Sequence, residues 1–145
     1  MVRTRRDARE RALSLCYELD VRGTVLDDLL FELPVAPAPY AVELARGVED
    51  HRDEIDAIIT KFADRWSIDR MPVIDRNLLR IAVFELGWQP EIPLGVAISE
   101  AVDLAKRYST DDSGRFVNGM LGRIGEQLRD NSGGHPRTPG ADGSA

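Results

Sequence analysis

The first eleven residues hold a dense group of cationic side chains. Five arginines stand there against two acidic residues, although the whole chain has a net charge of −6. Guanidinium groups bind phosphates and stack on bases, which are the contacts that hold single-stranded RNA. On the expected helix, Arg6 and Arg9 point away from the apolar stripe, and Arg3 and Arg5 lie at or before the frayed helix start. We therefore expect these four arginines to contact phosphates, with an ordinary solvated charge run as the alternative.

The other charged and nucleophilic residues do not indicate catalysis. Asp75, Arg76 and Glu85 punctuate an apolar segment, where ion pairing or surface exposure is a commoner explanation than acid–base chemistry. Cys16 is the only cysteine, and with two distant histidines it makes neither a disulfide nor a metal cage. The sequence also has no Gly-rich phosphate loop. We expect a binding protein without metal or cofactor rather than an enzyme.

Length and hydropathy indicate one soluble domain. A chain of 145 residues with 43% hydrophobic content can bury a single core. No apolar run approaches the roughly 20 residues that a membrane helix needs, and the N-terminal segment lacks the apolar part of a secretory signal. We expect a cytoplasmic protein with one domain over residues 1–130 and a disordered polar tail over residues 131–145.

Apolar periodicity predicts an all-α fold of six or seven helices. The expected helices span residues 4–22, 25–32, 40–65, 73–88, 94–108 and 113–129. Thr4 with Asp7, and Thr24 with Asp27, have the spacing of N-terminal caps for the first two helices. Gly47 is a possible break in the long third segment. The fourth helix is apolar almost all round, so we expect it at the centre of the packing.

Three stretches resemble the NusB family of bacterial transcription antitermination factors. Residues 66–86 read WSIDRMPVIDRNLLRIAVFEL, and residues 96–109 read VAISEAVDLAKRYS, continuing as DSGRFVNGML over residues 112–121. The segment RRDARERAL, residues 5–13, looks like the family's arginine-rich opening. The resemblance covers roughly residues 3–129 and is weakest over residues 24–39.

The resemblance implies two small helical bundles and binding to boxA single-stranded RNA in ribosomal RNA transcripts. The family's usual companion is the ribosomal protein NusE, with which it joins other Nus factors on RNA polymerase. Together they allow ribosomal RNA operons to be transcribed without premature termination. The resemblance also implies that residues 112–119 contribute to the RNA surface and that Tyr17 and Asp75 lie at the ribosomal protein interface.

Three features of the residues fit these implied surfaces. Leu13 and Tyr17 lie almost opposite the core stripe of the first helix, so they either pack within the chain or bind a partner, for which tyrosine is a favoured anchor. An acidic Asp75 facing a basic ribosomal protein would suit the charge of the chain. Phe116 lies about 100° from the centre of the core stripe of the last helix, so its ring is poorly placed for full burial.

A partly exposed Phe116 offers a platform on which a base can stack, beside the free backbone N–H groups of a helix start. Asp112 and Arg115 flank it, and we place both at the RNA surface. Tyr108 is the weaker member of this site, because it falls within the apolar stripe of the preceding helix. We expect Tyr108 to be core, with RNA contact as the alternative.

Two other functions compete with RNA binding. NusB-like domains also precede domains that methylate ribosomal RNA, but we expect no α/β cofactor domain here because a polar tail follows the helical unit. A structural bundle that self-associates as a homodimer would not bind RNA through the arginine-rich segment. Titration with single-stranded RNA separates this structural bundle from the RNA-binding protein.

Overall fold

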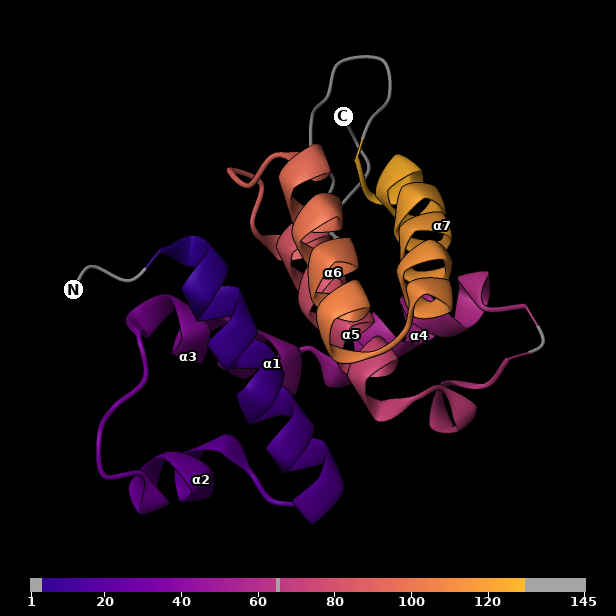
Figure 1. Ribbon diagram of the computed structural model, residues 1–145. Coiled ribbons are helices and arrows are strands. Elements are labelled where there is room, and N and C mark those ends of the chain that lie inside the picture. The colour runs from indigo at the N-terminus through magenta and orange to yellow at the C-terminus, as the bar shows by residue number, and fades with distance from the viewer. Residues whose placement is uncertain (1–3, 65, 130–145) are drawn as a thin grey trace.

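The computed structural model describes residues 4–64 and 66–129 (Figure 1). Seven α-helices and one short 3-10 helix make up most of this part of the chain, which confirms the all-α prediction. They are α1 (Arg5–Arg22), α2 (Leu26–Glu32), α3 (Pro39–Asp50), α4 (Arg52–Phe62), η1 (Ile68–Arg70), α5 (Val73–Trp88), α6 (Leu94–Tyr108) and α7 (Asp111–Leu128). In the described ranges no helix has the length and apolar character needed to span a membrane. Arg3 and the predicted tail lie outside the described residues.

The helices form two small bundles that share α5. Helices α1, α2 and α3 pack together on one side, while α6 and α7 pack on α5 and on each other, with α4 against α5 and α7 (Figure 1). Helix α5 contacts members of both bundles because it is apolar almost all round: Leu78, Leu79 and Val83 on it are fully buried. The predicted central position of this helix is confirmed.

The ends of α1 follow the predicted signals, but the start of α2 does not. Asp7 N donates to Thr4 Oγ1 at 3.1 Å, and Thr4 N donates to the Asp7 carboxylate at 3.2 Å, which completes the capping box. The predicted cap of α2 by Thr24 is wrong, because no side chain caps this helix from within. Instead, Leu26 N donates to the Glu49 carboxylate of α3 at 2.8 Å. A side chain of a neighbouring helix therefore accepts one of the free backbone N–H groups in the first turn of α2.

The long segment predicted over residues 40–65 is two helices, and the break falls at His51 rather than Gly47. The His51 ring stacks on Trp88 of α5, with 4.6 Å between ring centroids. Gly47 serves close packing instead, because a Cβ at this position would lie 2.2 Å from the Phe84 ring. This glycine therefore lets α3 approach α5.

Candidate RNA and partner surfaces

Arg5 and Arg6 lie exposed in the first turn of α1, as predicted. The Arg5 guanidinium lies 4.0 Å from the centroid of the Tyr40 ring, in cation–π geometry. Arg6 Nη2 lies 2.8 Å from the Glu100 carboxylate of α6, while 63% of the Arg6 side chain remains exposed. The Glu100 side chain is only 12% exposed, but Arg9 Nη1 also lies 3.5 Å from its carboxylate, so Glu100 keeps a cationic neighbour when Arg6 turns to a phosphate. No local pattern around the arginines points to Tyr40 or Glu100, because both come from other helices.

The expectation that Arg9 points outward is wrong. Arg9 is only 5% exposed, and its Nε lies 3.0 Å from both carboxylate oxygens of Glu85 on α5. The Tyr40 hydroxyl donates to the same carboxylate at 2.6 Å. Burial lowers the pKa of Arg9, but hydrogen bonding and the charge of Glu85 outweigh this and raise it above its ordinary value. Arg9 is therefore not free to bind a phosphate, because its guanidinium is paired inside the protein with the Glu85 carboxylate of α5.

The junction between α6 and α7 places three of the predicted site residues on one turn. Thr110 caps α7 by accepting from Ser113 N at 2.9 Å. Asp112 and Arg115 are exposed and pair with each other. Phe116 is half-buried, which confirms that its ring is not fully covered, and it packs against Trp66 with 4.8 Å between ring centroids. The position of Trp66 beside Phe116 was not predicted, because Trp66 lies in the connection after α4, where no periodic pattern indicates its contacts.

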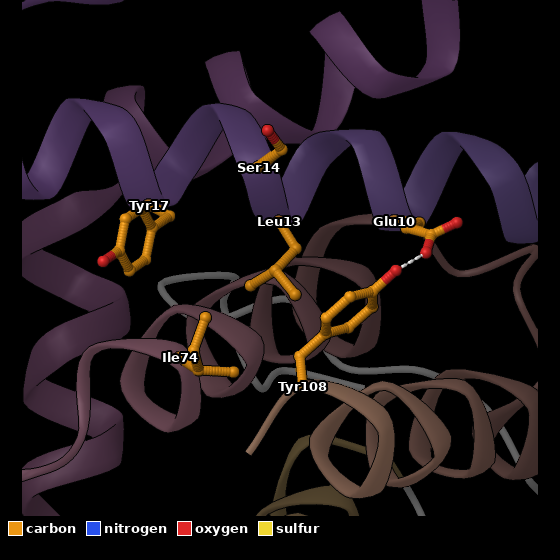
Figure 2. Close-up of a pocket in the computed structure, with 6 residues that line it drawn as sticks. All are labelled: Glu10, Leu13, Ser14, Tyr17, Ile74 and Tyr108. Atoms are coloured by element: carbon orange, nitrogen blue, oxygen red, sulfur yellow. Dashed lines mark hydrogen bonds between the residues drawn. The ribbon is translucent and has the colours of Figure 1, made fainter.

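Tyr108 is 47% exposed, so the expectation that it belongs to the core is wrong. It is the last residue of α6, where the helix faces α1, and its hydroxyl donates to the Glu10 carboxylate (Figure 2). Arg107 also pairs with Glu10, at 3.1 Å. These contacts join the end of α6 to α1.

An open groove of about 540 Å³ runs between α1, α5 and α6. Figure 2 shows its lining residues, which are Glu10, Leu13, Ser14, Tyr17, Ile74 and Tyr108. Leu13 is buried at the floor, so the chain itself covers this half of the second apolar strip on α1. The other half stays open, because Tyr17 is 42% exposed. An apolar hollow flanked by two tyrosines and a carboxylate suits a protein partner that carries apolar and cationic side chains.

The expectation that Asp75 faces a partner is wrong for the unbound protein. Asp75 is 1% exposed and accepts a hydrogen bond from Ser113 Oγ at 2.8 Å. It lies in the first turn of α5, which the first turn of α7 covers. Asp75 therefore ties α5 to the α6–α7 junction from beneath, whereas its neighbour Ile74 lines the groove.

The fold and these surfaces define a small protein of two helical bundles that share a central helix, with exposed arginines at the start of α1 and an apolar groove beside them. Residues 6–126 match the NusB family, to which the chain therefore belongs.

Relatives and solved structures agree with this assignment. The transcription antitermination protein NusB of Salinispora tropica is 50% identical over 129 residues, covering 84% of this chain and 95% of that protein. The protein of the same name from Thermobifida fusca is 44% identical over 128 residues, covering 86% and 90% of the two chains. The structure of T. maritima NusB superimposes with a TM-score of 0.79 at 36% identity, covering 88% and 94%. A structure of antitermination factors NusB and NusE in complex with dsRNA gives a TM-score of 0.75 at 34% identity, covering 88% and 99%.

Proposed function

We propose that this protein is a transcription antitermination factor that binds a boxA-like single-stranded RNA of ribosomal RNA transcripts. The observation that carries the proposal is the exposed cationic start of α1, where Arg5 and Arg6 stand at the surface of a chain with a net charge of −6. An acidic protein repels RNA over most of its surface, so a local cationic site directs the strand to one place. The names of the relatives support this function.

The RNA surface of this proposal consists of Arg5 and Arg6 on α1, with Arg115 and Phe116 on α7. Asp112 pairs with Arg115 at the helix start, where it orients the guanidinium and accepts hydrogen bonds from base edges. Arg9 has no direct role, because it is buried against Glu85.

The partner surface of this proposal is the groove, with Tyr17 as its exposed anchor. The partner is the ribosomal protein NusE, and the related structure of NusB with NusE and RNA supports this choice. Tyr108 lines the groove, so we assign it to the partner surface rather than to RNA. Through NusE the protein joins other Nus factors and RNA polymerase, so that ribosomal RNA operons are transcribed to their ends.

Titration of a labelled boxA-like RNA with this protein, alone and with NusE, tests the proposal. We expect RNA binding by the protein alone and tighter binding when NusE adds its own contacts to the same strand. The Tyr17→Ala variant should lose the enhancement by NusE while it keeps its own RNA affinity. Phe31→Ala is the matched control, because Phe31 is a 93% exposed aromatic on α2 outside the groove. Absence of RNA binding with and without NusE would refute the function.

A further inference from the structure

Trp66 presents an aromatic surface to solvent next to the proposed RNA site. Its side chain lies in the connection between α4 and η1, and it is 37% exposed. It packs against Phe116 at an interplanar angle of 63°, in edge-to-face geometry. In an edge-to-face pair, each ring keeps at least one face that its partner does not cover. The pair therefore extends the aromatic surface of α7 onto a second segment of the chain.

Arginines of α7 border this aromatic pair. Arg115 precedes Phe116 and is exposed. Arg123 lies two turns further along α7, and its Nη2 donates to the carbonyl oxygen of Phe62 at 3.0 Å. Because Trp66 N donates to the carbonyl oxygen of Ala63, also at 3.0 Å, Arg123 and Trp66 are both tied to the end of α4. Aromatic faces beside cationic side chains are the combination that holds single-stranded nucleic acids.

The position of Trp66 continues the surface already described. In the view of Figure 1, the connection between α6 and α7 lies between α1 and the segment after α4. A strand that begins at Arg5 and Arg6 and crosses the α6–α7 junction at Phe116 meets Trp66 next, because the two rings are in contact. Arg115 pairs with Asp112 and Arg123 with Asp64, but both are surface pairs whose arginine side chains are 73% and 51% exposed, so each guanidinium can turn to a phosphate, which favours a polyanion as the occupant.

We propose that Trp66 is an RNA-binding residue that stacks on a base beyond Phe116, with Arg123 on the adjacent phosphate. This inference rests on the proposed function, and it lengthens the RNA track past the α6–α7 junction to the end of α4. Stacking accepts any base, so Trp66 adds affinity and sets the length of the bound strand rather than its sequence.

Two measurements on the full chain test the proposal. Trp66→Ala should weaken binding of a boxA-like RNA by about 5-fold to 150-fold, because one stacked base contributes about 1–3 kcal/mol. Trp66→Phe should keep most of the affinity, and Phe31→Ala should bind like the wild type. RNA shortened from the end that reaches Trp66 should bind wild type and Trp66→Ala equally.

Tryptophan fluorescence gives a readout that a purely structural role would not change. The chain has two tryptophans, so a Trp88→Phe variant reports on Trp66 alone and a Trp66→Phe variant on Trp88 alone. RNA should quench the first variant strongly and the second little. Wild-type affinity of Trp66→Ala together with unquenched Trp66 would overturn this inference and leave the proposed function standing. A wild-type protein that binds no RNA would overturn both.

Discussion

Arg9 of α1 and Glu85 of α5 form an ion pair inside the protein, with Arg9 Nη2 2.9 Å from Glu85 Oε2 and side chains that are 6% and 1% exposed. The pair joins the first bundle to the central helix. It also explains why an arginine-rich helix start is not simply a row of RNA-binding side chains.

Removal of one partner of this pair should be far more harmful than removal of both. Arg9→Met leaves a charged Glu85 in the interior, so we expect a loss of about 3–5 kcal/mol in the free energy of unfolding. The double variant Arg9→Met, Glu85→Met buries no unpaired charge and should recover much of this loss. Urea unfolding of the wild type, Arg9→Met, Glu85→Met and the double variant measures the coupling. Losses that simply add would contradict the pairing.

The positions of most helices along the chain were predictable from the sequence because apolar periodicity and caps are local. The bounds of α5 and α6 were predicted to the residue, and the Thr4 cap was correct. The errors at Arg9, Asp75 and Tyr108 have one cause. A helical projection separates an apolar face from a polar one, but it does not show that another helix brings a carboxylate or a hydroxyl to the polar face. Similarly, the contact of Trp66 with Phe116 depends on how a connection lies across α7.

Asp20 should make the stability depend on pH. Burial alone would raise the pKa of Asp20, but hydrogen bonds from Arg76 and Asn77 and the charge of Arg80 lower it from 3.8 to about 2. Because the folded-state pKa is depressed, this stabilisation is present above about pH 4 and is lost as the pH falls towards 2. Near neutral pH, we expect the free energy of unfolding of the wild type to exceed that of Asp20→Asn by about 2 kcal/mol. Chemical unfolding across this range should show the two converging at low pH, and a constant difference would contradict the assignment.

Arg129 should be essential for the end of α5. Its guanidinium donates to the carbonyl oxygens of Leu86, Glu85 and Gln89, each at 3.2 Å, and also to that of Ile92. The oxygens of Glu85 and Gln89 also accept backbone N–H groups, but among the described residues Arg129 is the donor to those of Leu86 and Ile92, so we expect Arg129→Ala to cost about 3 kcal/mol. Arg129→Lys should rescue little, because a single ammonium cannot reach all four oxygens. Thermal unfolding measures both, and near wild-type stability of the lysine variant would contradict this role.

Gly47 and Gly119 should respond to alanine in opposite directions. A Cβ at Gly47 would meet the Phe84 ring, so Gly47→Ala should cost about 1–3 kcal/mol through overpacking. A Cβ at Gly119, within α7, has nothing within 4 Å, so Gly119→Ala should stabilise the protein by about 0.5–1 kcal/mol. Thermal unfolding of the two variants compares them directly. A harmless Gly47→Ala would show that α3 and α5 do not pack so closely.

The salt dependence of RNA binding tests the central claim most directly, which is that Arg5 and Arg6 hold RNA phosphates. The Arg5→Ala, Arg6→Ala variant should bind boxA-like RNA more weakly, with a log–log salt slope that is shallower by about 0.7 for each lost contact. Arg22→Ala is the control, because Arg22 is a partly exposed, ion-paired arginine at the opposite end of the same helix. It should leave affinity and slope unchanged. A double variant that keeps both the wild-type affinity and the wild-type slope would contradict the account.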